Sequence, residues 1–295
     1  MGWKHDKMRR KGEGCLRSEE EMRTLILAVA QEIGAKAVAL SGSRVNPCVP
    51  KDDFQDYDIV YVVENKTELL ENRAWLKRFG EILVSQRPGE MTLFPSTLGE
   101  RFTFLMLFKD GNRIDLTLCP LSFVEQWRVE EPLFQVLADP ENILQPAPQL
   151  TDEIYRTQVP SEAMFQDCCN EFWWVTTYVV KGLVRHEQTY TVDHLYGICH
   201  QELLRLLSWQ VVRQQGPVNV GKNYKYLFTY LDAAYKQKFQ SLLDFSSESN
   251  IAQSLLATQR FFHEEAQLYA TQTKVSYDKV TAENVIAYTQ KWMNS

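Results

Sequence analysis

The sequence predicts an α+β protein in which a domain with a mixed β-sheet is followed by an all-helical domain. The first half contains short β-branched and aromatic runs, and two of them flank the polar turn Lys109-Asp110-Gly111-Asn112, which favours an antiparallel hairpin. From about residue 161 onward, apolar residues recur instead at helical spacing. The expected domains are therefore residues 22–150 and 151–295, preceded by a disordered extension over residues 1–21.

The first predicted element is a helix that begins at a capping box. Ser18 is followed three residues later by Glu21, so that each side chain can satisfy a backbone N–H of the first turn. Gly34 is expected to end this helix, because glycine readily adopts the left-handed conformation found there. The other expected elements are strands at residues 35–40, 59–63, 82–84, 102–108 and 113–118, and a second helix from Asn65 or Thr67 to about Phe79. The hairpin argues against a doubly wound parallel fold.

Five long amphipathic segments make up the second half. They lie near residues 161–186, 191–214, 222–236, 249–271 and 278–293. Gly216-Pro217 breaks the pattern between the second and the third segment. The stretch from Leu137 to Pro148 is irregular and contains prolines, so we place the domain boundary there or shortly after it.

The composition is that of a globular protein and excludes several classes. The 295 residues are 44% hydrophobic and 24% charged. No apolar run reaches the roughly 18 residues that a membrane span needs. The first twenty residues are polar and carry no apolar core, so we expect no secretory signal and a cytoplasmic location. A net charge of −6 disfavours a nucleic-acid partner, which usually needs a basic face.

Cysteine and histidine spacing gives no sign of a zinc site. The six cysteines include no C-x2-C pair, and the adjacent Cys168 and Cys169 cannot easily bridge each other. Free thiols in a reducing compartment are the better interpretation. His194 and His200 share a predicted helix, but six positions apart they fall on different faces. The oligomeric state stays open between a monomer and a small homo-oligomer.

Two carboxylates, those of Asp56 and Asp58, stand where a buried strand is predicted to begin. Side chains alternate along a strand, so Asp56 and Asp58 point the same way and Tyr57 points the other. Two carboxylates this close repel each other unless a cation lies between them. Oxygen ligands alone favour a hard ion, Mg²⁺ above all. For an isolated D-x-D, a solvated acidic turn is the alternative interpretation.

Neighbouring features favour chemistry at phosphorus over a solvated turn. Asp115 lies on the polar face of the returning hairpin strand and can lie beside the first two carboxylates. Two Mg²⁺ ions about 3.5–4 Å apart could then clamp both oxygens of an in-line displacement. Upstream, Gly42 lets a phosphate approach the backbone, Ser43 can donate to it, and Arg44 can pair with it through its planar fork. The spacing fits neither an EF-hand nor a P-loop.

Longer strings around these residues resemble a known family. Gly42-Ser43, the D-x-D and the later strand carboxylate are similar to the nucleotidyltransferase superfamily typified by DNA polymerase beta. More specifically, the chain looks like the bacterial streptomycin (aminoglycoside) 6-adenylyltransferases at residues 40–52, 54–61, 170–173, 178–183 and 220–225. The resemblance extends from about Met22 to the C-terminus. The short motif is shared by the whole superfamily, whereas the long strings are far more specific.

The resemblance implies a fold, a reaction and its cofactor. It implies a polymerase beta-like nucleotidyltransferase domain followed by a helical domain that binds substrate. The implied reaction transfers AMP from ATP to a hydroxyl of streptomycin, which inactivates the antibiotic and confers resistance. Asp56 and Asp58 would hold Mg²⁺. Asp115 would complete the metal site or act as general base toward the drug hydroxyl, the role given to the third carboxylate in similar enzymes.

The helical half should supply groups that bind the drug and the nucleotide. Streptomycin bears two guanidinium groups, which pair best with carboxylates. The acidic candidates are Asp167, Glu171, Glu187, Asp193 and Glu202. We assign substrate binding to Glu171 and Asp193, with Glu171 first because it lies in a family-like string. Lys222, with Lys225, could reach the triphosphate. The neighbouring Trp173-Trp174 is expected in the core, and a solvated helix surface is the alternative for the charged residues.

Two other functions stay open. The same chemistry could act on another acceptor, either a different aminoglycoside or an RNA 3′ end, although the acidic balance disfavours RNA. The chain could also be a nucleotide-binding regulator without turnover. All three carboxylates argue against the regulator, because a protein that only binds a nucleotide has no need of their mutual repulsion.

Overall fold

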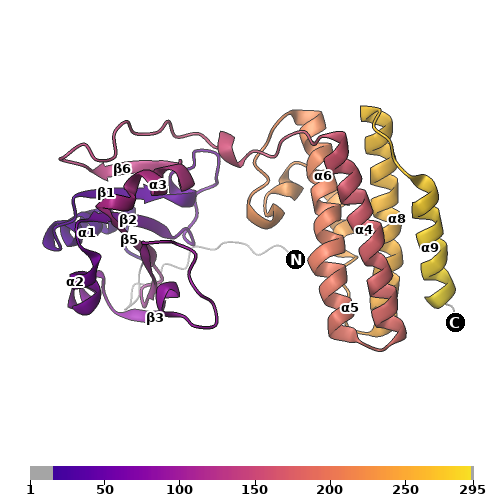
Figure 1. Cartoon of the computed structure of the whole chain (residues 1–295), viewed down its shortest axis with the longest axis horizontal. Coiled ribbons are helices and arrows are strands. Elements are labelled where there is room, and N and C mark those ends of the chain that lie inside the picture. The colour runs from indigo at the N-terminus through magenta and orange to yellow at the C-terminus, as the bar shows by residue number, and fades with distance from the viewer. Residues whose placement is uncertain (1–15, 294–295) are drawn as a thin grey trace. The chain divides into compact units, whose positions relative to one another are not determined.

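The chain folds into two compact units, which are described separately. The structure is a computed structural model that describes residues 16–293. The first unit ends at Asp152 and the second begins at Glu153, two residues beyond the predicted boundary (Figure 1). The first unit is built around a β-sheet and the second is helical, so the predicted α+β class is confirmed.

The sheet of the first unit is mixed and has six strands in the order β3-β4-β5-β2-β1-β6. Strands β2 and β5 pair in parallel, and the other neighbours pair antiparallel. The strands are β1 (Ala37–Ser41), β2 (Tyr57–Val63), β3 (Ile82–Gln86), β4 (Phe102–Phe108), β5 (Arg113–Pro120) and β6 (Phe134–Ala138). Strands β4 and β5 form the predicted hairpin. Strand β6 was not predicted, because its identity as a strand depends on its distant partner β1.

The first helix follows the sequence prediction closely. Helix α1 (Glu19–Glu32) begins at the expected capping box: the Glu21 N–H donates to Ser18 Oγ at 3.2 Å, and the Ser18 N–H donates to Glu21 Oε2 at 2.7 Å. Gly34 follows with a φ of 71°, the left-handed conformation expected of it. The capping chemistry is local in sequence, and it is therefore visible without the fold.

The predicted extension is too long at its end nearest the fold. Arg17 already belongs to the first unit: its Nε donates to Asp110 Oδ2 at 2.5 Å and its Nη1 donates to the Phe79 carbonyl at 2.6 Å. Residues 16–21 are thus part of the first unit, because Arg17, just before α1, is hydrogen-bonded to Phe79 and to Asp110 in the β4–β5 turn. The remainder of the predicted extension, residues 1–15, lies outside the described residues.

The second predicted helix is broken. Helix α2 (Lys66–Glu71) is short, and a 3₁₀ helix (Ala74–Phe79) replaces its continuation. Asn72 lies between them in an extended conformation, and its side-chain oxygen accepts the N–H of Ala74 at 3.2 Å. Asparagine competes with helical hydrogen bonding in this way. Helix α3 (Val124–Glu130), which was not predicted, comes between β5 and β6.

Alternation along β2 divides its side chains between two cores. Ile59 and Tyr61 belong to the core that contains residues of α1. Val60 and Val62 belong to the core that contains Trp127 of α3. Asp58 has the same parity as Val60 and Val62, so it points to the α3 side of the sheet. Asp58 lies near the start of β2, next to the apolar residues Val60 and Val62 of the same face.

The second unit is a bundle of amphipathic helices (Figure 1). Helices α4, α6 and α8 pack against one another, and α9 packs against α4 and α8. Their bounds, with those of the shorter helices, are α4 (Glu162–Val184), α5 (Gln188–His194), α6 (His200–Gln215), α7 (Ala233–Gln240), α8 (Glu248–Thr273) and α9 (Lys279–Met293). Phe172 and Phe262 stack at the centre, with 3.7 Å between their ring centroids.

Two of the five predicted helices differ from the structure. The segment at 191–214 is α5 and α6 joined by a π-helical stretch (Leu195–Cys199). The segment at 222–236 is not a helix; it contains two 3₁₀ turns before α7 begins at Ala233. Asn223 and Tyr224 have positive φ angles of 54° and 60°, and a right-handed helix cannot pass through such residues.

Two further sequence expectations concern cysteines and membranes. The cysteines among the described residues are free thiols, four of them buried. Within residues 16–293, no helix is both long enough and apolar enough to cross a membrane.

Candidate active site

The three carboxylates singled out in the sequence meet at one end of β2 and β5. Asp58 and Asp115 are register partners in this parallel pair. Asp56 directly precedes β2, on the same side as Asp58. One oxygen atom from each of the three side chains lies within 4.8 Å of the other two. The structure therefore brings together all three predicted metal ligands, on strands whose hydrogen bonding fixes their spacing.

The charges of this cluster destabilise one another. Burial raises the pKa of Asp58 to about 7, and the two neighbouring carboxylates and Glu131 raise it in the same direction, while Arg113 opposes them. A divalent cation would remove this repulsion and restore the ionised form of Asp58. Every donor atom is a carboxylate oxygen, the ligand type that Mg²⁺ prefers. The residues present thus fit a Mg²⁺ site.

Gly42 is required by the carboxylate itself. It has a φ of 70°, and a Cβ atom built on it would lie 1.9 Å from Asp58 Oδ2. The reason is the register of β1 and β2, which pairs Ser41 with Asp58 and so brings the start of the next turn against the acid. The first steric requirement at Gly42 is thus contact with Asp58, and close approach of a phosphate to its backbone stays a prediction. Ser43 follows in the same 3₁₀ turn (Gly42–Arg44).

Arg44 has a different task from the one predicted. Its Nε donates to the Asp56 carbonyl at 3.0 Å, and its Nη2 donates to the Gln55 carbonyl at 2.6 Å. Its guanidinium carbon lies 3.7 Å from the centroid of the Tyr57 ring. The planar fork expected to bind phosphate is therefore directed at the backbone, because the loop folds back over the turn. Arg44 fixes the segment that carries Asp56.

Two residues at the site were not predicted to belong to it. Arg113 pairs bidentately with Asp115, from Nε to Oδ1 at 2.8 Å and from Nη2 to Oδ2 at 2.7 Å. Its Nε is also 3.6 Å from Asp56 Oδ2. Gln55 Nε2 donates to the Ser43 carbonyl at 3.3 Å, and its buried Oε1 finds no partner among the described residues. Strand alternation could have revealed Arg113, since it shares a face with Asp115; Gln55 lies in the family-like string at residues 54–61, which assigns it no role.

The predicted substrate and nucleotide residues of the second unit are all exposed. Glu171 lies on α4, Asp193 on α5, and Lys222 opens a 3₁₀ turn (Lys222–Tyr224). Their exposure leaves these side chains accessible to a ligand, and their roles stay predictions. Glu202, another acidic candidate, is buried and pairs with Arg205 through both of its oxygens, at 2.8 and 3.1 Å. Both of its oxygens are therefore already engaged by a neighbour on α6.

The two adjacent tryptophans separate, contrary to the expectation that both belong to the core. Trp173 is 3% exposed and buried in the bundle, whereas Trp174 is 60% exposed. The Trp174 indole N–H donates to the Tyr178 hydroxyl at 2.7 Å. The Lys181 ammonium lies 4.7 Å from the centroid of the Tyr178 ring and 5.4 Å from that of Tyr190. Trp174 and Tyr178 thus form an aromatic strip along α4, which begins one turn after Glu171.

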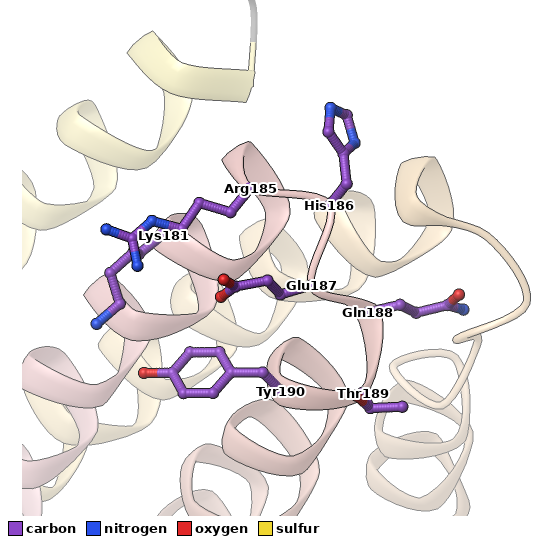
Figure 2. A pocket seen from close by; sticks show the side chains of 7 residues that line it. All are labelled: Lys181, Arg185, His186, Glu187, Gln188, Thr189 and Tyr190. Carbon is purple, nitrogen blue, oxygen red and sulfur yellow. The ribbon is translucent and has the colours of Figure 1, made fainter.

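A surface cleft of about 600 Å³ opens at the turn between α4 and α5 (Figure 2). It is lined by Lys181, Arg185, His186, Glu187, Gln188, Thr189 and Tyr190. In Figure 2 the side chains of Glu187 and Tyr190 extend to the same side as that of Lys181, while Gln188 extends away. A single carboxylate among cations cannot hold a hard metal ion, so we place the chemistry at the three aspartates and not here.

Comparisons with known proteins find relatives that match over most of this chain. The chain is 38% identical over 264 residues to an aminoglycoside 6-adenylyltransferase of Campylobacter jejuni, an alignment that covers 89% of this chain and 91% of the relative. It is 38% identical over 250 residues to an aminoglycoside 6-adenylyltransferase of Bacillus subtilis, covering 84% and 88% of the two chains. A crystal structure of a Bacillus subtilis aminoglycoside 6-adenyltransferase matches with a TM-score of 0.48 and 33% identity, over 95% of this chain and 100% of that one.

A family match covers nearly the whole of the described chain. The model of the family described as streptomycin adenylyltransferase matches residues 16–292. The match begins before Met22, where the sequence resemblance was placed, and it includes both units. This chain therefore belongs to the streptomycin adenylyltransferase family.

Proposed function

We propose that this chain transfers AMP from ATP to a hydroxyl group of streptomycin in a Mg²⁺-dependent reaction, and that the modification confers resistance to the drug. The observation that carries the proposal is the convergence of Asp56, Asp58 and Asp115, with oxygens within 4.8 Å of one another. The mutual repulsion of three carboxylates is costly unless positive charge balances it, and a divalent cation supplies that charge. The family and the names of the relatives support the nature of the two substrates.

The three aspartates would divide the work. Asp56 and Asp58 would hold Mg²⁺, which neutralises charge on the α-phosphate and keeps the attacking and leaving oxygens in line. Asp115 would complete the ligand set or take the proton from the drug hydroxyl. The two roles compete, because a carboxylate fully engaged by a metal is a weak base. One oxygen of Asp115 must stay free of metal if it is to act as the base.

The first unit also offers groups for the nucleotide. The Gly42-Ser43 turn borders Asp58, so that its backbone N–H groups and the Ser43 hydroxyl would stand near phosphates bound at the metal. Arg44 would act indirectly, by holding the backbone of Asp56. Lys222 of the second unit would contact the triphosphate.

The acceptor would be recognised by opposite charge and by ring faces. Glu171 and Asp193 would pair with the two guanidinium groups of streptomycin. Trp174 follows Glu171 on α4 and is 60% exposed, so its ring offers a surface on which a guanidinium can stack. Bidentate pairing with a carboxylate and stacking on an aromatic ring both suit a planar guanidinium better than a compact ammonium group, and so would favour streptomycin over aminoglycosides that carry only amines.

A panel of drugs tests this proposal directly. Purified full-length protein is mixed with Mg²⁺, ATP and one aminoglycoside at a time, and pyrophosphate release and product mass are measured. We expect adenylylated streptomycin and no product without Mg²⁺. Product with kanamycin but not with streptomycin would refute the assigned acceptor and keep the chemistry. No product with any drug, while ATP still binds, would favour a nucleotide-binding regulator.

A further inference from the structure

Arg113 places a cation inside the carboxylate cluster of the first unit. Its guanidinium donates two hydrogen bonds to Asp115, at 2.8 and 2.7 Å, and approaches Asp56 to 3.6 Å. The pairing engages both oxygens of Asp115. Asp115 and Asp56 are two of the three acids to which the proposed function assigns Mg²⁺ binding. The side chain of Arg113 is nevertheless 47% exposed, so it has room to leave.

We propose that Arg113 is the internal counter-ion of the aspartate cluster: it neutralises Asp115 and Asp56 in the metal-free protein and has to give way when a divalent ion binds. The inference rests on the proposed function, since it takes the cluster to be the metal site. It adds a positioning residue that competes with the metal.

Electrostatics make Arg113 and a metal alternatives to each other. Each oxygen of Asp115 keeps a lone pair while it accepts from Arg113, so a metal is not excluded by lack of ligand atoms. A divalent ion bound there would, however, lie beside a fixed guanidinium, and like charges a few ångströms apart repel strongly at a partly buried site. At least one of the two hydrogen bonds must break.

The alternative is that Arg113 merely makes a surface ion pair. Exposed pairs of this kind contribute little to stability. Arg78 provides a comparison in the same unit, because its Nε donates to Glu32 at 3.0 Å and its side chain is 59% exposed. Arg78 has no metal-ligand candidate as its partner. Replacing each arginine therefore separates the loss of an ion pair from the loss of the counter-ion.

The test measures binding of Mn²⁺ alone, by the loss of the free-ion signal in electron paramagnetic resonance, to full-length protein without nucleotide. Arg113→Gln should bind Mn²⁺ roughly threefold to tenfold more tightly than the unchanged protein, because a partly exposed bidentate pair no longer has to open. Arg78→Gln should bind like the unchanged protein. Metal-free Arg113→Gln should also melt at a lower temperature than metal-free Arg78→Gln, and Mn²⁺ should restore it.

Two further variants decide between explanations. Arg113→Lys keeps the charge but loses the fork, so we expect at most a smaller gain in Mn²⁺ affinity; a gain as large as that of Arg113→Gln would show that the positive charge is not what competes with the metal and would overturn the inference. Unchanged or weaker binding by Arg113→Gln would also overturn it. Asp58→Asn should abolish Mn²⁺ binding. If the unchanged protein and Asp58→Asn bind Mn²⁺ equally, the metal site of the proposed function fails as well.

Discussion

The aspartate cluster and the aromatic strip of α4 are built in opposite ways. Asp58 and Asp115 are held by the hydrogen-bonded register of two strands, and Gly42 touches Asp58 so closely that no side chain fits between them. Glu171 and Trp174 stand on the exposed side of a helix whose other side is core. The proposed chemistry thus rests on positions with almost no conformational freedom. The proposed recognition of the acceptor rests on exposed positions that can change without disturbing the fold.

The largest expected effect is loss of the reaction on changing the rigid region. Asp58→Asn should lower the rate of AMP transfer at least about 10³-fold, because a metal ligand is lost and metal stabilisation of the transition state is worth several kcal/mol. Pyrophosphate release measures the rate. The helical content by circular dichroism should not change. A variant that keeps more than a tenth of the activity would contradict the metal assignment.

Gly42→Ala tests how little freedom the rigid region has. The new Cβ would overlap Asp58 Oδ2, so we expect a loss of about 2–4 kcal/mol in the free energy of unfolding, together with about a hundredfold loss of activity. Gly34→Ala is the matched control: its φ is 71°, close to the 70° of Gly42, and no atom lies within 4 Å of its added Cβ. It should cost only the conformational strain of about 1 kcal/mol and keep its activity. Equal effects of the two variants would show that contact with Asp58 does not matter.

The pH dependence of stability reports the repulsion within the cluster. In the metal-free protein the pKa of Asp58 is raised to about 7 from an ordinary 3.8, so the folded state binds more protons than the unfolded state between these values. Stability should therefore fall as pH rises from about 4 to about 7, relative to Asp58→Asn, by at most about 4 kcal/mol. Urea unfolding with a chelator present measures the difference. If the free energy of unfolding of the unchanged protein instead rose with pH relative to that of Asp58→Asn, the predicted direction would be wrong. Added Mg²⁺ should remove the loss.

The smallest effect on the reaction is expected from a change on the exposed face of α4. Glu171→Gln should raise KM for streptomycin about tenfold and leave kcat nearly unchanged, because a charge-assisted pair to a guanidinium contributes about 1.5 kcal/mol to binding. Asp167→Asn, one turn earlier on the same helix and also exposed, is the control. Equal rises in KM would indicate a general effect of negative charge. A fall in kcat without a change in KM would place Glu171 in the chemistry and not in recognition.

The part of the site that is local in sequence was predictable. The alternation of Asp56 and Asp58, the hairpin that presents Asp115, and the capping box at Ser18 all follow from periods of two or a few residues. Arg113 could have been placed by the same alternation. Its pairing with Asp115 was not predicted, because an arginine and an aspartate on the same face of a strand are also typical of a solvated surface.

The segment at residues 222–236 shows the opposite case. Its composition favours a helix, yet Asn223 and Tyr224 take positive φ angles that no helix contains. Their conformation is set by the packing of the turn, where Tyr226 N–H donates to the Val220 carbonyl at 2.8 Å. Tyr224 also packs against the core of the helical unit, and tertiary packing overrides a modest local preference of this kind.

The class of the fold, the two kinds of unit and the three acids follow from neighbouring residues, because strand and helix periods and short-range hydrogen bonding are local in sequence. Tertiary structure alone decided that β2 and β5 pair in parallel with Asp58 opposite Asp115, that Gly42 makes room for that acid, and that Arg44 turns toward the backbone while Arg113 turns toward the cluster. The physical reason is that these outcomes depend on which distant segments share a sheet, and register between strands is fixed by the packing of whole faces.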